Sequence, residues 1–209
     1  GVSLNFSNYI NTIIDLKQSI LDSYNKDFDY SNGSYLTRIQ ENNSFGSIYG
    51  FRYKGVYQYS EYEPGREGTS PFALDENKNI IRNAAGDPVR MTFAAGESAE
   101  YKFNGGDAIY EDINHDGNIN ELDIVYLGNS NPLFNGGLSL KFNFKRLSAN
   151  IFSNFRVGNK VVNRARMLAE NMHSNNNQAA SVNWRWRKDG DVTTIPRALY
   201  QNGYNWLGS

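Results

Sequence analysis

The 209-residue chain contains no cysteine and only two histidines, His115 and His173. Without thiols it forms neither disulfides nor thiolate-bound metal sites, and two imidazoles leave little for transition-metal binding. Lys and Arg number 21 against 22 Asp and Glu, so no basic excess exists to pair with phosphates, and nucleic acid is not an expected partner. No apolar run approaches about 18 residues, which excludes a transmembrane helix but not a transmembrane β-barrel, whose strands alternate in polarity.

Aromatic residues, glycine and asparagine are abundant instead, with 14 Tyr, 12 Phe, 19 Gly and 29 Asn. Aromatic side chains favour pleated surfaces, and Gly and Asn tolerate turns with positive φ. The composition therefore predicts an all-β fold with long polar loops.

The clearest periodicity lies between residues 138 and 156, where Leu, Phe and Ile alternate with polar residues on both sides of Lys145-Arg146. This pattern predicts an antiparallel hairpin with one apolar and one polar face. The apolar face either covers the core of a soluble sheet or faces lipid. In the second case a watery lumen receives the side chains of Lys141, Asn143, Asn150 and Arg156.

Other segments give weaker signals. Residues 51–59 alternate aromatic with polar side chains and predict a strand whose Tyr residues suit an interfacial aromatic girdle. A helix is expected over 161–172, where apolar residues recur at helical spacing. Shorter strands are expected at 2–14, 35–40, 80–82 and 89–93.

Connections between the confident strands run to about 50 to 80 residues, far beyond the usual loop of about 4 to 6. The turn at Lys145-Arg146 is, by contrast, two residues long. Short turns on one side and long loops on the other are typical of outer-membrane barrels.

One segment carries a chemical motif. Residues 112–123 follow the twelve-residue calcium loop, with oxygen-bearing residues at alternate positions and Gly117 at the sharp turn in position 6. The short closing Asp at position 12, where Glu is usual, predicts a weaker last contact. The expected Ca²⁺ ligands are Asp112, Asn114, Asp116, Asn118 (through its backbone carbonyl), Asn120 and Asp123.

An Asx-rich turn that binds no metal is the alternative interpretation of this loop. Its flanks, 109–110 and 124–126, are strand-like and too short for the helices of an EF-hand, and no second copy is present. We therefore expect a structural metal that holds a long connection, with no role as sensor or catalyst.

Catalytic patterns are absent from the sequence: it has no Gly-x-Ser-x-Gly, phosphate-binding glycine loop or His-Glu-x-x-His. We do not expect an enzyme. Aromatic side chains near the end of the chain are candidates for stacking on sugar rings or peptide side chains, although they serve equally well as loop anchors. These substrate-binding candidates are Trp184, Trp186, Tyr200 and Trp206.

Several of these stretches together resemble the C-terminal part of SusC/RagA-type TonB-dependent outer-membrane transporters. The resemblance covers most of the chain after residue 45. It rests on GSIYGFRYKGVYQ (46–58), GDAIYEDINHDGNINELD (106–123), LGNSNP (127–132), the strand pair 137–163 and WRWRKDGDVTTIPRA (184–198).

The resemblance implies a plugged antiparallel transmembrane β-barrel of about 22 strands in the outer membrane. Its implied partners are a SusD-like surface lipoprotein that captures glycans or peptides, the lipid bilayer, and TonB through the plug. Residues 1–209 would be a portion of the barrel domain without the plug and the last strands. Extracellular loops would span 60–137, including the calcium loop 112–123, and 157–209.

Because an open sheet edge cannot remain unpaired in a membrane, the remainder of the barrel is an expected partner. The main alternative is a soluble, calcium-stabilised β-sandwich that binds carbohydrate. A cohesin-binding dockerin shares the calcium loop but needs two copies and helices, so it ranks below both.

Overall fold

The computed structural model describes residues 1–25, 36, 37, 39–93, 101–201, 203 and 204. They divide into two compact units. Unit 1 comprises residues 1–28, 37–49 and 126–162, and unit 2 comprises residues 29–36, 50–125 and 163–209. Strands dominate and helices are few and short, which confirms the all-β prediction. In the described part of the chain, no helix has the length and hydropathy needed to cross a membrane.

Most of the described strands are short, and two of them, β10 and β11, exceed seven residues. The strands are β1 Val2–Asn8, β2 Leu36–Thr37, β3 Ser47–Phe51, β4 Tyr53–Val56, β5 Thr92–Phe93, β6 Tyr101–Lys102, β7 Ala108–Tyr110, β8 Asn118–Ile119, β9 Ile124–Asn129, β10 Phe134–Phe144 and β11 Leu147–Val157. The helices are α1 Gln18–Asn25 and α2 Arg164–Glu170, with 3-10 turns η1 Glu121–Asp123 and η2 Ala180–Trp184.

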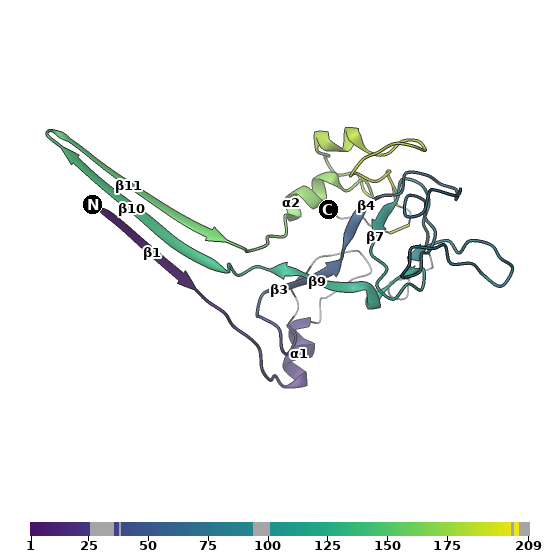
Figure 1. The fold of residues 1–209 in the computed structure, drawn as a ribbon, viewed down its shortest axis with the longest axis horizontal. Coiled ribbons are helices and arrows are strands. Elements are labelled where there is room, and N and C mark those ends of the chain that lie inside the picture. The colour runs from purple at the N-terminus through teal and green to yellow at the C-terminus, as the bar shows by residue number, and fades with distance from the viewer. Residues whose placement is uncertain (26–35, 38, 94–100, 202, 205–209) are drawn as a thin grey trace. The chain divides into compact units, whose positions relative to one another are not determined.

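Unit 1 contains an antiparallel sheet with the strand order β1-β10-β11 (Figure 1). β10 and β11 form the predicted hairpin, and Phe144 pairs with Leu147 across the two-residue turn. Lys145 adopts a φ of 52° there, the left-handed conformation that a tight turn needs. β10 begins four residues before the predicted strand, because Phe134 pairs with Asn8 of β1.

The register of this sheet separates its side chains by polarity. Val2, Leu140 and Ile151 stand opposite one another across the three strands, whereas Ser3 and Ser139 pair on the other face. Residues paired with one another share a face, so the period-two pattern is continued from strand to strand. The apolar face carries Val2, Leu4, Phe6, Phe134, Leu138, Leu140, Phe142, Phe144, Leu147, Ala149, Ile151, Phe155 and Val157.

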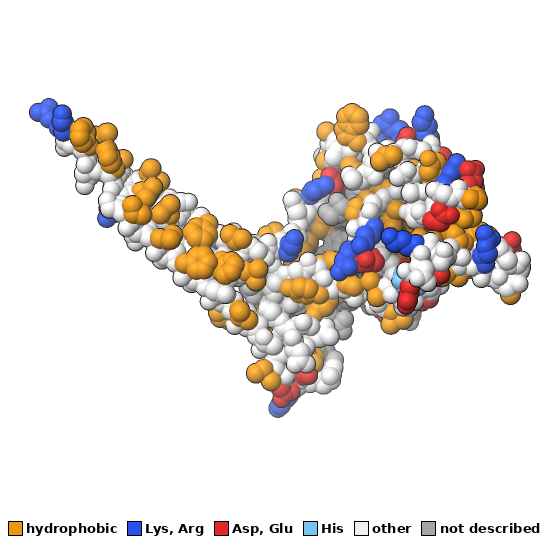
Figure 2. All heavy atoms as spheres, in the orientation of Figure 1, with side chains coloured by type: hydrophobic (Ala, Val, Ile, Leu, Met, Phe, Trp, Pro, Cys, Tyr) orange, Lys and Arg blue, Asp and Glu red, His pale blue; other side chains and the backbone are white. Residues whose placement is uncertain are grey.

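Most of these apolar side chains are exposed within the described chain. Leu4 is 67% exposed, Phe142 56% and Ile151 60%, and hydrophobic side chains follow the sheet from end to end in Figure 2. Phe6 lies against Phe134 with ring centroids 5.2 Å apart, so apolar side chains of neighbouring strands pack together on this face. The polar face contains hydrogen bonds such as that from Ser7 Oγ to Asn135 Oδ1 at 2.7 Å.

The segment 127–132 joins two parts of unit 1. Ser130 donates its backbone N–H to the carbonyl of Gly46 at 3.0 Å, and Asn131 Nδ2 donates to the carbonyl of Phe45 at 2.6 Å. Gly46 has a φ of 87°, and a Cβ there would lie 2.5 Å from Ser130 Oγ. The Asn and Ser residues of this segment therefore bind the loop that precedes β3.

Unit 2 has a buried aromatic core. Phe103 is fully buried, with the rings of Tyr204, Tyr101 and Tyr57 at 5.3, 5.8 and 6.0 Å between centroids. Many of these ring pairs are tilted or edge-to-face, the arrangement that aromatic quadrupoles favour. The core comprises Phe51, Tyr57, Ala73, Met91, Phe93, Phe103, Ala108, Tyr110, Ile119, Met172, Val182, Ile195, Leu199 and Tyr204.

The prediction of an aromatic girdle over residues 51–59 is wrong. The segment divides into β3 and β4, and Phe51 and Tyr57 are buried in the core of unit 2. Tyr53 Oη donates to the carbonyl of Thr194 at 2.7 Å. These rings have protein neighbours because β4 pairs with β7 and not with a long transmembrane strand.

Three other predicted elements are shorter than expected. β1 ends at Asn8, and α2 begins at Arg164, because the side chain of Asn163 caps the helix by accepting from the Arg166 N–H at 3.0 Å. The segments expected as strands at 80–82 and 89–93 form mostly isolated bridges, such as that between Arg82 and Pro88, and the two-residue strand β5 pairs with β6 and β8. Of the strand predicted at 35–40, residues 35 and 38 lie outside the described residues, and β2 covers two of the others.

Candidate functional site

The predicted calcium loop, residues 112–123, lies in unit 2 and is closed by its own carboxylates. Asp112 Oδ2 accepts from the Gly117 N–H at 2.8 Å. Asp123 is fully buried and accepts from the N–H groups of Ile113 at 2.8 Å and Asn120 at 2.9 Å. The first and last residues of the motif therefore both point into the loop.

The loop is attached to the core at its turn. Gly117 has a φ of 82°, and a Cβ there would lie 2.9 Å from the Cβ of Ala73. His115 Nδ1 donates to the carbonyl of Leu74 at 2.9 Å. Ile119, the residue at position 8 of the motif, is fully buried in the aromatic core. Since β8 also pairs in parallel with β5, the conformation of the loop determines the position of this small sheet.

Negative charge accumulates in the loop. Burial raises the pKa of Asp112 and of Asp123 above the ordinary value, and the nearby charge of Asp116 raises both further, against the lowering by loop N–H donors. A cation among these oxygens would remove the repulsion and compensate for the lost hydration. The donor set, carboxylates with amide and backbone oxygens, is the one that Ca²⁺ prefers.

Within the ranges that the structure describes, no three His, Cys, Asp or Glu side chains converge so as to hold a metal ion. The Asp116 carboxylate instead accepts from Asn114 Nδ2 at 2.8 Å and from the Asn118 N–H at 2.7 Å. The expected ligand set also includes Asn side chains and a backbone carbonyl, so calcium binding by this loop stays a prediction.

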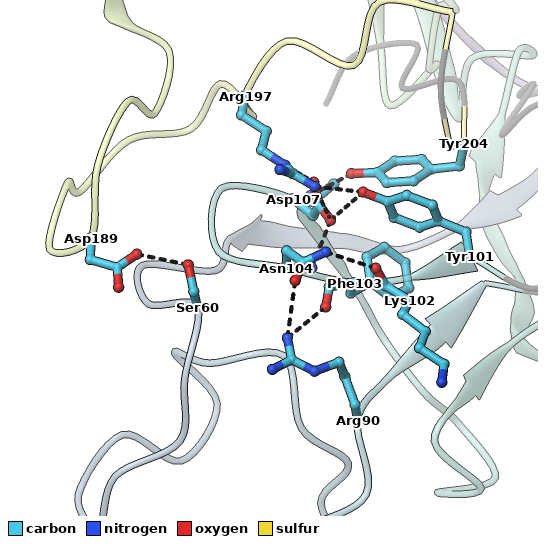
Figure 3. Close-up of polar contacts among 11 residues, drawn as sticks. Ser60, Arg90, Tyr101, Lys102, Phe103, Asn104, Asp107, Asp189, Arg197 and Tyr204 are labelled. Atoms are coloured by element: carbon cyan, nitrogen blue, oxygen red, sulfur yellow. Dashed lines mark hydrogen bonds and ion pairs between the residues drawn. The ribbon is translucent and has the colours of Figure 1, made fainter.

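A second polar cluster in unit 2 was not predicted from the sequence. Asp107 is fully buried and pairs with Arg197, whose Nε lies 2.6 Å from Asp107 Oδ1 (Figure 3). Arg197 Nη2 also donates to Tyr101 Oη at 2.7 Å, and that hydroxyl donates to Asp107 Oδ2 at 2.8 Å. The N–H of Asn104 completes the carboxylate's partners at 2.8 Å.

This cluster fastens residues 197–204 to the β4–β7 region. Tyr204 Oη accepts from the N–H of Ala108 at 2.6 Å, and Arg197 donates its own N–H to the carbonyl of Gly106 at 2.7 Å. Burial raises the pKa of Asp107, and the guanidinium of Arg197 opposes that rise. Because the partners are 90 residues apart in the chain, no local sequence pattern could have identified them.

The four aromatic residues proposed to contact substrate have different surroundings. Trp186 is packed flat on Gly106, where a Cβ would lie 2.3 Å from its ring, and its indole N–H donates to the carbonyl of Gln58 at 3.2 Å. Trp184 is 78% exposed and Tyr200 is 52% exposed. Trp206 lies outside the described residues.

Tyr200 borders a surface cavity of about 430 Å³ in unit 2, which is wide open to solvent. Three segments form its wall: the chain after α2, the residue after η2, and residues 198–200. The lining residues are Met172, Ser174, Asn175, Asn176, Gln178, Arg185, Ala198 and Tyr200. Apart from Tyr200, none of the four aromatic candidates belongs to this lining, and no sequence motif pointed to the others.

The sequence of this chain was compared with protein-family models and with curated proteins. No protein-family model matches the chain. It is 29% identical to TonB-dependent receptor P39 of Formosa agariphila, in an alignment that covers 99% of this chain and 20% of that protein. It is 26% identical to TonB-dependent receptor P3 of the same organism, over 94% of this chain and 16% of that protein.

The chain is thus similar in sequence to a segment of two TonB-dependent receptors. It spans about a fifth or less of the length of these curated relatives. The similarity extends over both units, so it includes the sheet of unit 1 as well as the aromatic core of unit 2.

Proposed function

We propose that this chain contributes barrel wall and outside loops to a TonB-dependent transporter of the outer membrane, and that it is not an enzyme. The observation that carries the proposal is the register of β1, β10 and β11, which places apolar side chains on one face of all three strands and polar ones on the other. A barrel wall between lipid and a watery lumen has this arrangement.

Strand length agrees with this role. β10 and β11 contain 11 residues each, and a strand that crosses a bilayer obliquely needs about 9 to 11. The pattern has exceptions: Phe152 lies on the polar face, and Asn8 and Ser153 lie on the apolar face. In the described chain β1 and β11 are the outer strands of the sheet, so the proposal requires further barrel strands to pair with them.

The finer assignments follow from the resemblance to SusC/RagA-type proteins and from the names of the relatives. We propose that the partners are a SusD-like surface lipoprotein, TonB acting through a plug, and a glycan or peptide substrate. Residues 60–137 and 157–209 would face the outside and contribute to the substrate chamber.

We also propose that residues 112–123 bind Ca²⁺ as a structural ion. Asp112, Asp116 and Asp123 would supply carboxylates, of which that of Asp123 is fully buried, and Asn114, Asn118 and Asn120 would supply neutral oxygens. Since Ile119 in this loop belongs to the core of unit 2, a bound cation would stabilise the core together with the loop.

The soluble β-sandwich requires the same apolar rows to pack against a second sheet. Side chains of these rows are more than half exposed at Leu4, Phe142 and Ile151. This exposure favours the barrel wall, and no specific observation favours the sandwich.

Cysteine scanning tests the two faces directly, because the 209-residue chain has no native thiol. Phe142→Cys and Ile151→Cys should react with a maleimide that partitions into the bilayer and resist a charged maleimide. Asn143→Cys and Asn150→Cys, on the adjacent positions of the same strands, should show the reverse preference. Equal labelling of all four by the charged reagent in native membranes would contradict the proposal.

A further inference from the structure

The cavity bordered by Tyr200 has a positively charged residue in its lining and no negatively charged one. Arg185 is among its lining residues, and no Asp or Glu is. Among the described ion pairs Arg185 takes part in none, and its described hydrogen bond from the guanidinium goes to the carbonyl of Val182 at 3.3 Å. A half-buried guanidinium has five donors in a planar fork, so this wall suits a carboxylate or another planar anionic group.

The remaining wall is rich in groups that both donate and accept hydrogen bonds. Asn175, Asn176 and Gln178 present side-chain amides, and Ser174 presents a hydroxyl that accepts from Asn176 Nδ2 at 2.9 Å. Amide groups suit hydroxyls, which also donate and accept. The half-exposed ring of Tyr200 offers an apolar surface to the C–H face of a sugar.

None of the lining residues belongs to a strand. A peptide that bound here would therefore find no strand edge with which to pair its backbone. The wall thus favours a hydroxylated ring over an extended peptide.

The walls of the cavity are fastened to one another. His173 Nδ1 donates to the carbonyl of Leu199 at 2.8 Å, and the Gln201 N–H donates to the carbonyl of His173 at 3.0 Å. On the other side, the Ala179 N–H donates to the carbonyl of Ala169 at 2.7 Å. A wall held in this way loses less conformational entropy when a ligand binds, and a volume of about 430 Å³ is within the range of small-ligand sites.

We infer that this cavity binds an acidic saccharide, with Arg185 on the carboxylate of a uronic acid, the amides of Asn175, Asn176 and Gln178 on hydroxyls, and Tyr200 beneath the ring. The inference rests on the proposed function, since it assigns a substrate class to that transporter. It concerns binding alone, so it can be tested without energised transport.

The test is isothermal titration of the purified detergent-solubilised protein that contains this chain. The probes are a uronic-acid tetrasaccharide, its carboxyl-reduced neutral counterpart and a tetraglutamate peptide. We expect the acidic saccharide to bind at least about tenfold more tightly than either of the other probes, the size of one charge-assisted contact. Arg185→Gln should remove the preference for the acidic over the neutral saccharide. Its dissociation constant for the neutral saccharide should stay within about twofold of that of the parent protein.

Arg187→Gln is the matched control. Arg187 is an exposed neighbour whose guanidinium donates to the carbonyl of Asn183 at 2.7 Å and is not part of the cavity wall. This variant should bind like the parent protein. Arg185→Lys, which keeps the charge but loses the planar fork, should retain part of the preference and serves if Arg185→Gln fails to fold. Tyr200→Ala should weaken both saccharides.

Three outcomes would overturn the inference: equal binding of acidic and neutral saccharides, equal losses in Arg185→Gln and Arg187→Gln, or tighter binding of tetraglutamate than of the acidic saccharide. Failure of the transport proposal is recognised separately. If the cysteines are labelled as expected but the protein does not bind uronic acids, only the cavity inference is contradicted. If the protein binds the saccharide but the cysteines are not labelled as expected, only the membrane-wall proposal is contradicted.

Discussion

The two units of the chain use the same kinds of side chain in opposite ways. In unit 1, Leu, Ile and Phe form an exposed row along a three-stranded sheet, whereas in unit 2 Phe and Tyr form a buried cluster around Phe103. An apolar side chain is stabilised wherever it leaves water, whether in lipid or in a protein interior. The difference shows that the apolar residues of a sequence do not by themselves indicate where the protein core lies. Whether such a side chain is buried in a core or exposed depends on the residues that pack around it.

The largest expected effect is in the core of unit 2. Phe103→Ala should destabilise the protein by about 3–5 kcal/mol, because it leaves a cavity among five aromatic rings that cannot all move to fill it. Chemical unfolding followed by tryptophan fluorescence measures the change. Phe142→Ala, which truncates an exposed ring in unit 1, is the comparison. If it costs as much as Phe103→Ala, unit 1 has a buried core and the contrast between the units is wrong.

A charged residue placed on the apolar face of the β1-β10-β11 sheet tests whether this face of unit 1 contacts lipid. Ile151→Arg should cost about 2–4 kcal/mol when the protein is folded in a bilayer, because that position lies in the middle of β11 on the face assigned to lipid. Asn150→Arg, one residue earlier on the polar face, should change stability little. Reversible unfolding in lipid vesicles measures both, and equal costs would remove the distinction between the faces.

Calcium should stabilise unit 2 and leave the sheet of unit 1 unaffected. At free calcium about a hundredfold above the dissociation constant, the expected gain is about 2.7 kcal/mol. Asp112→Ala combined with Asp116→Ala should abolish the gain and accelerate proteolysis between Ser60 and Gly137. Equal protease resistance with and without chelator would exclude a bound ion.

The buried pair of Asp107 and Arg197 should contribute less, since Arg197 keeps contact with solvent. Arg197→Met should cost about 2–3 kcal/mol, because it leaves the Asp107 carboxylate without its ion-pair partner. Limited proteolysis should then cut within residues 184–204 sooner. The double variant with Asp107→Asn should recover part of the loss, and a further loss in its place would show that the two side chains act independently.

The smallest effect is expected at the surface of unit 2. Glu111 Oε1 lies 2.8 Å from Lys54 Nζ, and this contact, with help from Arg52, lowers the pKa of Glu111. A lowered pKa gives stability that is present above the ordinary pKa of Glu and is lost as the pH falls through the folded value. In the parent protein, the free energy of unfolding should therefore fall as the pH drops below about 4.5, and Glu111→Gln should remove less than about 1 kcal/mol of this fall. A profile identical to that of the parent would show that the pair contributes nothing.

Sequence patterns predicted the two long strands of unit 1 but not its helix α1, and they predicted less of unit 2. The hairpin of β10 and β11 and its turn at Lys145-Arg146 were predicted because strand alternation is a local property. The helix near residue 165 was predicted too long, since the capping hydrogen bond of Asn163 determines its start. The aromatic stretch 51–59 was misassigned because alternation identifies a strand but not the partner that covers it.

The predicted functional residues divide in the same way. The loop 112–123 was predicted from its spacing to bind calcium, which stays a prediction, and its carboxylates turn inward at Asp112 and Asp123. The cavity beside Tyr200 was not recognised, because its lining comes from three separate segments.

By itself, the sequence determined which residues alternate and therefore that β10 and β11 have two unlike faces, since a strand's side-chain period is fixed by its backbone. Only the tertiary structure decided that β1 joins this sheet across more than 120 residues of chain, as Asn8 pairs with Phe134, and that Asp107 meets Arg197. Such pairings depend on which distant groups satisfy one another's hydrogen bonds and exclude water together. That is a property of the whole fold, and no short stretch of residues carries it.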